Sequence, residues 1–254
     1  DRADGLRPWL VVASAGTTDT GAVDPLPAIA DVAQREGLWL HVDGAYGASF
    51  ALTDEGKRRL AGLERADSLV LDPHKGLFLP FGTGLVLVRD GDELRQAYTF
   101  TASYMQDTGG FGEAMELSPA AASPELSRHF RALRLWLPLK LAGVGAFRAA
   151  LEEKLLLARY FHARMAELPD FEVGPEPDLS IVVFRYVPDE GDADAFNLQL
   201  AERIQADGRI YLSTTRLDGR IVLRLAVLNV RSHRREVDLA VEVIRETAAA
   251  LASS

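Results

Sequence analysis

The sequence predicts an α/β protein: a mostly parallel sheet with helices on both faces, followed by a smaller α+β unit. In the first part of the chain, short apolar runs typical of buried strands alternate with segments of helical periodicity. Such alternation implies a mostly parallel sheet, because parallel neighbours are joined through helical crossovers. In the last third, short strands that can pair directly take over, which indicates a separate α+β unit.

The first unit contains four predicted strands and three predicted helices. Pro25 stands near the start of the first helix with Asp24 as its N-cap, and Gly37 ends that helix. Its apolar residues recur at the spacing of one helical face. The predicted strands are 9–13, 38–42, 68–71 and 84–88, and the predicted helices are 25–36, 53–62 and 90–98.

The middle of the chain has a different character. Residues 101–124 contain several glycines and Ser-Pro steps without a clear period, which is typical of an active-site loop. Helical patterns resume over 125–141, with a kink expected at Pro138. A long amphipathic helix is then predicted over 144–168.

The last part is predicted to form the small unit. A hairpin turn is expected at Asp218-Gly219, and Gly208 suits the end of a helix. The chain therefore divides into residues 1–143, part of a large domain, and residues 144–254, a connecting helix with a small domain. The predicted strands are 171–173, 181–184, 210–213 and 221–225, and the predicted helices are 193–207 and 233–252.

Composition narrows the possible classes of protein. The 254 residues carry 28 Lys+Arg and 37 Asp+Glu, a formal net charge of −9, which argues against a general nucleic-acid surface. Cysteine is absent, so disulfides and thiolate metal sites are excluded. No apolar run has transmembrane length, and we expect a cytoplasmic location. Because a core strand follows almost at once on Asp1, we also expect a preceding segment.

Two charged residues follow the ends of predicted strands. Lys75 comes shortly after the strand 68–71, and Asp43 ends the strand that precedes it. Ligands of open α/β sheets bind at the carboxyl edge of the strands. An amine and a carboxylate there suit an aldehyde cofactor with a ring nitrogen, namely pyridoxal phosphate (PLP). A single lysine after a strand is more often a solvated surface residue, so the case depends on the whole set.

Other side chains complete this set. Ala45 is small enough to contact one ring face, and His74, Thr18 and Ser68 are polar groups that could order the lysine and a phosphate. The remaining histidines show no metal-ligand spacing, so we predict no metal site. They are His41, His129, His162 and His233.

The order of these motifs resembles the group II PLP-dependent amino-acid decarboxylases, which have the aspartate-aminotransferase fold (PLP fold type I). Weaker similarity continues through 130–136 and 222–226, so the resemblance covers nearly the whole chain. The motifs that carry it are Gly16-Thr17-Thr18, Leu40-His41-Val42-Asp43-Gly44-Ala45-Tyr46, Ala66-Asp67-Ser68 and Asp72-Pro73-His74-Lys75. Asp72 stands where the family often has Asn.

The resemblance implies a role for each residue near the strand ends. Lys75 would be the Schiff-base lysine, and Asp43 the partner of the pyridine nitrogen. Ala45 would contact the ring, and Thr18 would lie beside the cofactor. His74, together with Ser68, would lie near the phosphate or the lysine.

The resemblance also implies residues outside this edge. Tyr104 resembles the mobile-loop tyrosine that protonates Cα after carbon dioxide leaves. Ser127 would approach the phosphate of a partner subunit, because family sites form at the interface of a homodimer. The substrate would be an L-amino acid, with the aromatic branch nearest around Tyr104. Family members carry a large amino-terminal portion, so this chain alone is not expected to be active.

Two other functions remain open. One is a different PLP outcome on the same fold: an aldehyde synthase, a carbon–carbon lyase or an aminotransferase. Tyr104 favours simple decarboxylation, because related aldehyde synthases typically have phenylalanine there. The other is a non-catalytic fragment that acts as a partner or scaffold. The presence of both Lys75 and Asp43 argues against it.

Overall fold

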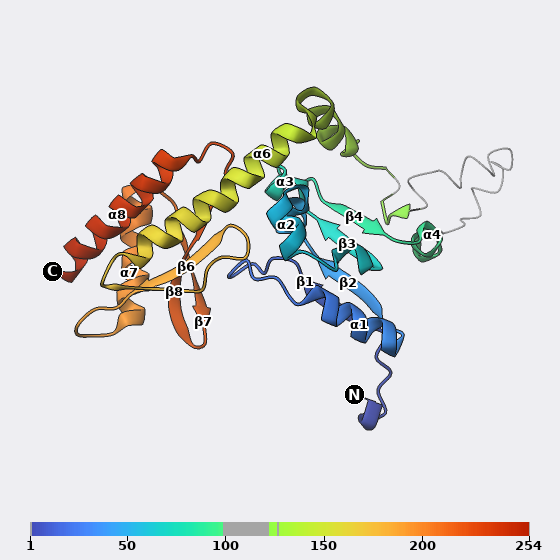
Figure 1. The fold of residues 1–254 in the computed structure, drawn as a ribbon, viewed down its shortest axis with the longest axis horizontal. Coiled ribbons are helices and arrows are strands. Elements are labelled where there is room, and N and C mark those ends of the chain that lie inside the picture. Colours follow the sequence, from blue (N-terminus) through green and yellow to red (C-terminus); the bar gives the residue numbers. More distant parts are fainter. Residues whose placement is uncertain (1, 99–121, 126, 254) are drawn as a thin grey trace.

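The computed structural model describes residues 2–98, 122–125 and 127–253. Two four-stranded sheets are present in this part of the chain, and a long helix, α6, connects them (Figure 1). The first sheet lies in residues 10–88 and the second in residues 171–226. This arrangement places the two sheets on either side of the predicted division at residue 143.

The first sheet has the predicted strands in the order β1-β2-β3-β4. The first three strands are parallel, and β4 is antiparallel to β3. The mostly parallel α/β sheet is thereby confirmed. The strands are β1 (Leu10–Ser14), β2 (Trp39–Asp43), β3 (Ser68–Leu71) and β4 (Leu85–Val88).

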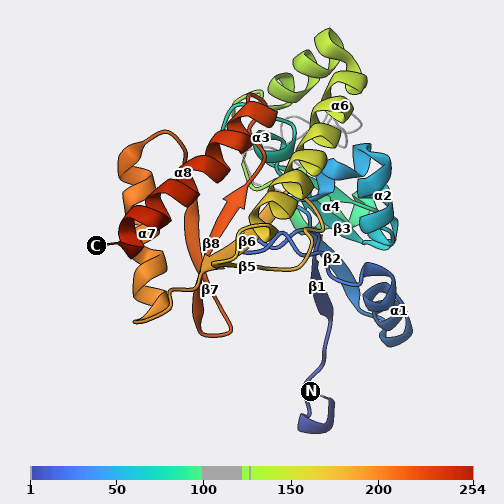
Figure 2. The same ribbon diagram turned by 60° about the vertical axis from the view of Figure 1, so that its left-hand side comes forward.

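One face of this sheet carries most of its helical cover (Figure 2). Alternate strand residues on that face, such as Ala13, Leu40 and Val42, are at most 1% exposed. They pack against helix residues such as Leu26 and Phe50. The elements around the sheet are α1 (Leu26–Glu36), η2 (Ala48–Leu52), α2 (Asp54–Arg59), η3 (Leu63–Arg65), α3 (Pro73–Gly76) and α4 (Gly91–Tyr98), after a short η1 (Arg2–Asp4).

The opposite face is largely open within the described residues. Only α4 lines it, beside a cavity of about 420 Å³ that Trp39 and Val88 border. Trp9 is 72% exposed and Val12 is 55% exposed. Cover on this face is therefore partial here, whereas the sequence predicted helices on both faces.

The first helix does not begin as predicted. Asp24 was expected to be its N-cap, but Pro25 occupies that position and no side chain caps the helix. The Asp24 carboxylate instead accepts a hydrogen bond of 2.7 Å from the backbone N–H of Ser14. The carboxylate thus ties the start of the helix to the end of β1.

Helix α6 (Ala132–Ala166) connects the two sheets, and its break lies between the two helices predicted over 125–141 and 144–168, not at Pro138, where a kink was expected. Pro138 lies inside the helix, while the helical dihedrals are interrupted at Gly143, with φ 72° and ψ 156°. Glycine tolerates this positive φ because it has no Cβ. Leu151 and Leu155 belong to the first core, and Phe161 to the second, so one helix joins both.

The second sheet is antiparallel throughout, in the order β5-β6-β8-β7. The strand predicted at 210–213 begins only at Ser213, and Tyr211 in the connection is 75% exposed. Asp218 and Gly219 both have positive φ, as a two-residue hairpin turn requires. The elements are β5 (Phe171–Val173), β6 (Ile181–Tyr186), α7 (Ala193–Asp207), β7 (Ser213–Leu217), β8 (Arg220–Ala226) and α8 (Arg234–Ala252).

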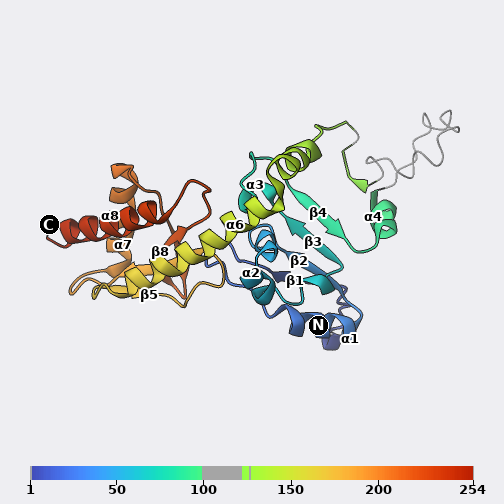
Figure 3. The same ribbon diagram turned by 45° about the horizontal axis from the view of Figure 1, so that its top comes forward.

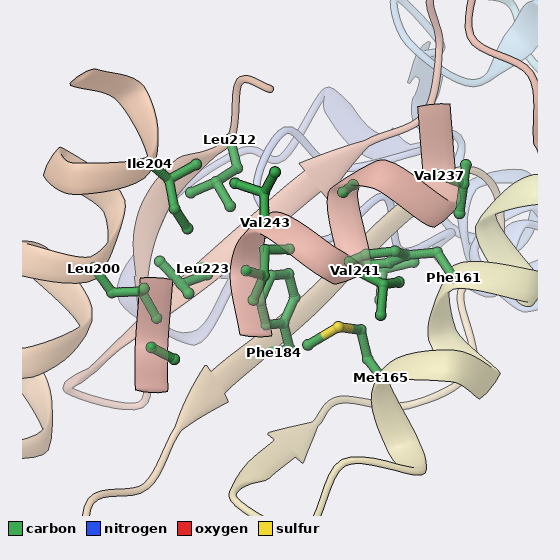
Figure 4. Packing of buried hydrophobic residues seen from close by; sticks show 14 of the residues in the cluster. Phe161, Met165, Phe184, Leu200, Ile204, Leu212, Leu223, Val237, Val241 and Val243 are labelled. Atoms are coloured by element: carbon green, nitrogen blue, oxygen red, sulfur yellow. The ribbon is translucent and has the colours of Figure 1, made fainter. Parts of the chain in front are cut away.

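Helices α6, α7 and α8 cover one face of the second sheet (Figures 3 and 4). Phe184 points into this core and meets Phe161 edge to face, with ring centroids 5.5 Å apart. Along β6, Val182 faces the same core while Ile181 and Val183 face the other way. That second face of the sheet packs against Tyr46 of the first unit.

None of the helices in the described part of the chain is both long enough and apolar enough to cross a membrane.

Candidate active site

The turns after β1, β2 and β3 meet at the carboxyl edge of the first sheet. Ala15 N–H donates to the carbonyl of Asp43 at 2.8 Å, which joins the first two turns. Asp72 N–H donates to the carbonyl of Ala45 at 3.2 Å, which joins the second and third. The chain thus brings three separate sequence motifs into one continuous backbone network.

Close packing at Gly47 makes this meeting possible. A Cβ at Gly47 would lie 2.0 Å from the carbonyl oxygen of Ala15 and 2.6 Å from Leu179. Only a residue without Cβ lets the second turn approach the first so closely. Gly16 faces the same contact and has a φ of 102°.

Lys75 lies on α3, a single helical turn directly after β3. Its Nζ is 2.8 Å from Oδ2 of Asp72, and its side chain is 43% exposed. The backbone N–H of Lys75 also donates to the carbonyl of Asp72, at 2.9 Å. Asp72 therefore holds both ends of the residue, and its carboxylate stabilises the protonated amine.

His74 is oriented by the following loop. Its Nδ1 lies 2.8 Å from the carbonyl oxygen of Thr83. A carbonyl only accepts hydrogen bonds, so Nδ1 must carry the proton. The other ring nitrogen, Nε2, is then available toward Asp72, whose Oδ2 lies 3.8 Å away. Phe81 contacts the ring edge on, with centroids 5.1 Å apart.

Asp43 ends β2 with its side chain exposed. Oδ1 accepts a hydrogen bond of 3.1 Å from the backbone N–H of Ala45, and Oδ2 has no partner among the described residues. A carboxylate with a free oxygen and an exposed amine therefore occupy neighbouring turns of one edge. This donor set fits an aldehyde cofactor whose ring nitrogen is held protonated.

Thr18 lies in the turn of residues 17–20, which follows β1. The Oγ1 atoms of Thr17 and Thr20 are 2.9 Å apart, and the N–H of Gly21 donates to the carbonyl of Thr17 at 2.8 Å. Thr18 itself is exposed. The turn is therefore folded on its own hydrogen bonds and leaves the Thr18 side chain free.

Ser68 does not join this group. It is the first residue of β3, so it lies at the opposite end of the strand from the turn that carries Lys75. Its Oγ accepts a hydrogen bond of 2.8 Å from Nε1 of Trp39 and lies 2.7 Å from Nδ1 of His41. The predicted contact with the lysine or a phosphate therefore has no support in the geometry, because position along a strand decides which edge a residue reaches.

The two remaining predicted residues are not placed at this edge. Ser127 is exposed in the segment before α6. Tyr104 lies outside the described residues. Their predicted roles stay predictions.

A contact with the second sheet was not foreseen from the sequence. The hydroxyl of Tyr46 lies 2.5 Å from Oγ of Ser180, which is fully buried. Burial raises the pKa of Tyr46 above its usual range, against the smaller opposing effects of Ser180 and Arg224. The residue next to Ala45 is thus fixed by the small unit, although the motif itself gives no signal of this.

Comparisons with known proteins decide the family. The sequence profile described as "Pyridoxal-dependent decarboxylase conserved domain" matches residues 1–187. The chain belongs to this family. The resemblance predicted from the motifs is confirmed, and so is PLP as the cofactor of the family.

Individual relatives agree with this assignment. The chain is 41% identical over 241 residues to an aromatic-L-amino-acid decarboxylase of Bacillus atrophaeus, covering 93% of this chain and 50% of that protein. It is 31% identical over 254 residues to a phenylacetaldehyde synthase of Arabidopsis thaliana, covering 99% and 52%. The crystal structure of Oryza sativa TDC with PLP and tryptamine superposes with a TM-score of 0.87 at 31% identity, covering 98% and 52%. The chain therefore spans about half the length of the curated relatives it matches.

Asp72 stands where the family often has Asn, and here its carboxylate makes an ion pair with the Lys75 amine. The spacing of three residues on a helical turn was the available signal, because such pairs lie on one face.

Proposed function

We propose that this chain supplies the lysine-bearing part of a PLP-dependent decarboxylase that converts an aromatic L-amino acid to its amine and carbon dioxide. The observation that carries the proposal is the pairing of Lys75 and Asp43 on adjacent turns of one sheet edge, joined through the hydrogen bond between Asp72 and Ala45. The names of the relatives support the aromatic class.

Each side chain at the edge has a task in this proposal. PLP, when bound, supplies an aldehyde that captures amines and a ring that accepts electrons from the breaking bond. Lys75 would hold the aldehyde as a Schiff base, and Asp43 would keep the ring nitrogen protonated. Ala45 would contact the ring, and Thr18 would lie beside it.

Titratable side chains lie around the lysine in this proposal. The carboxylate of Asp72 pairs with Nζ of Lys75 at 2.8 Å while the amine is free. His74 lies in the same cluster, with Nε2 3.8 Å from Oδ2 of Asp72 and Nδ1 bound to the Thr83 carbonyl. In this proposal Tyr104 donates a proton to Cα of the substrate.

The proposal includes partners for two exposed apolar surfaces. The open face of the first sheet, with Trp9 and Val12, would be covered by a part of the protein that corresponds to the unmatched half of its relatives. Phe130, just before α6, is 74% exposed and Leu141, in the first segment of α6, is 79% exposed, and this region would contribute to a homodimer interface. Ser127 precedes this segment, in keeping with a role at the partner's phosphate. A cytoplasmic location also remains part of the proposal.

The cofactor lysine can be tested by trapping. The protein, in the form in which its own cell produces it, is incubated with PLP, reduced with borohydride and digested, and its peptides are mapped by mass spectrometry. The expected result is one pyridoxyl adduct on Lys75, and none at that site in Lys75→Ala. Lys57→Ala is the matched control, because Lys57 is exposed and pairs with Asp54. Unchanged trapping in Lys75→Ala would count against the assignment.

The reaction outcome is tested by product analysis. Amine and carbon dioxide in equal amounts are expected from an aromatic L-amino acid. Aldehyde, ammonia and peroxide would instead support the second candidate, an aldehyde synthase, which the Arabidopsis thaliana relative brings into consideration. Tyr104→Phe sharpens the comparison: the proposal expects this variant to form more aldehyde than the unchanged protein.

A further inference from the structure

We propose that Arg224 of the second sheet is a positioning residue that fixes the 17–20 turn at the cofactor edge. This inference rests on the proposed function, in which Thr18 lies beside the cofactor. It assigns a task to the small unit that no sequence motif indicated.

The contact involves two successive peptide carbonyls. Arg224 lies on β8, and its Nη2 donates to the carbonyl of Thr18 at 2.5 Å. Its Nε donates to the carbonyl of Asp19 at 3.1 Å. A guanidinium is a planar fork of donors, so two carbonyls bound by one fork have a fixed relative orientation.

Arg224 also donates a hydrogen bond to the neighbouring strand β7. Its Nη1 donates to Oγ of Ser213, on the neighbouring strand β7, at 3.1 Å. Thr215 of the same strand donates from Oγ1 to Oδ1 of Asp19 at 2.7 Å. The turn is therefore attached to the second sheet through both its backbone and a side chain.

The internal hydrogen bonds of the turn do not reach the Thr18 peptide. Thr17 N–H donates to the carbonyl of Ala22, and Gly21 N–H donates to that of Thr17. These bonds close the ends of the turn, while Arg224 holds its tip. Without the guanidinium, the carbonyls of Thr18 and Asp19 lose their charged donor, and the peptides at the tip of the turn are no longer held.

The first measurement needs no cofactor. Hydrogen exchange of the naturally produced, cofactor-free protein is followed by mass spectrometry in peptides that cover residues 15–23. In Arg224→Ala, the amides of Thr17 and Gly21 should exchange about tenfold faster or more, because the turn opens locally. Arg224→Lys should restore little of this protection, because one ammonium cannot bind both carbonyls in the same geometry.

Two further variants separate this effect from general destabilisation. Arg216→Ala is the matched control, because Arg216 lies on β7 but donates to the carbonyl of Gly219 and to Asp194. It should leave exchange of the turn unchanged. Thr215→Val removes only the Asp19 side-chain contact, and a smaller acceleration confined to the turn is expected. It keeps the test valid if Arg224→Ala folds poorly.

The second measurement concerns the loaded protein. Arg224→Ala should weaken PLP binding and lower kcat about tenfold, with KM for the amino acid changed less than about threefold. Unchanged exchange of the turn in Arg224→Ala would overturn the proposal. So would a rise in KM alone, which would mean that Arg224 contacts the substrate. Failure of the unchanged protein to bind PLP would reject the proposed function, and the exchange result would still decide whether Arg224 holds the turn.

Discussion

Removing the Tyr46 hydroxyl tests the contact between the two sheets. The hydroxyl lies 2.5 Å from Oγ of Ser180, a residue with 0% exposure. Tyr46→Phe leaves the Ser180 hydroxyl buried without this partner, which should cost about 1–3 kcal/mol of unfolding free energy. Ser180→Ala leaves the Tyr46 hydroxyl in the same position and should cost a similar amount.

The double variant gives the decisive magnitude. Tyr46→Phe with Ser180→Ala removes both hydroxyls, so neither is left unpaired, and the combined loss should be smaller than the sum of the single losses. We expect a coupling of about 1 kcal/mol, well above the roughly 0.3–0.5 kcal/mol within which independent sites add.

Urea unfolding of the naturally produced protein, followed by circular dichroism, measures these free energies. The control is Tyr211→Phe, because Tyr211 is 75% exposed and its hydroxyl has no described partner. It should change stability by less than about 0.5 kcal/mol. Additive single losses would refute the reasoning, since they would show that the two hydroxyls do not interact in the folded protein.

Three further predictions concern packing, a buried cation and pH. Gly47→Ala should cost about 3 kcal/mol or more of unfolding free energy in urea, because the new Cβ would lie 2.0 Å from the Ala15 carbonyl oxygen. Gly145→Ala is the control and should be neutral or stabilising, because nothing lies within 4 Å of its new Cβ. Equal effects of the two changes would contradict this prediction. Lys154→Met should cost about 1–3 kcal/mol of unfolding free energy, because the fully buried amine donates to the Ser232 carbonyl and to Glu153. Lys140 is exposed, so Lys140→Met should cost less than about 0.5 kcal/mol in the same assay. The pKa of Tyr46 is raised in the folded protein, so the stabilisation that its neutral hydroxyl provides is complete below the unfolded pKa of about 10 and is lost as the pH rises further. Between about pH 9 and pH 11, Tyr46→Phe should therefore lose less stability than the unchanged protein. A parallel decline in both proteins would argue against this assignment.

The strand pattern of the first sheet followed from local sequence. Runs such as 38–42 are apolar and short, and the first two strands each lead through a helix to the next, so strand positions and the parallel pairing of β1, β2 and β3 could be predicted together. The same reasoning placed Lys75 and Asp43 at one edge, because parallel strands share the direction of their carboxyl ends. The hairpin turn at Asp218-Gly219 could also be predicted, because the turn needs positive φ at both residues and these residue types tolerate it.

Predictions failed where one residue had several partners available. Asp24 had the right type and place for a helix cap, but the backbone N–H of Ser14 took its carboxylate. A kink was expected at Pro138, yet the helix continues through it and breaks at Gly143, between the two predicted helices, where the backbone adopts a positive φ. In both cases the local preference was real and a competing contact or conformation decided the outcome.

The sequence by itself determined the alternation of elements, the family, and the amine and carboxylate that a PLP site needs. These depend on residue types and on short spacings along the chain, which the sequence states directly. Only the tertiary structure decided that Ser68 faces Trp39 and His41 and that Arg224 reaches a turn 206 residues away. Such contacts depend on which strands lie side by side and on how the two sheets pack against each other, and no local pattern of side chains specifies that arrangement.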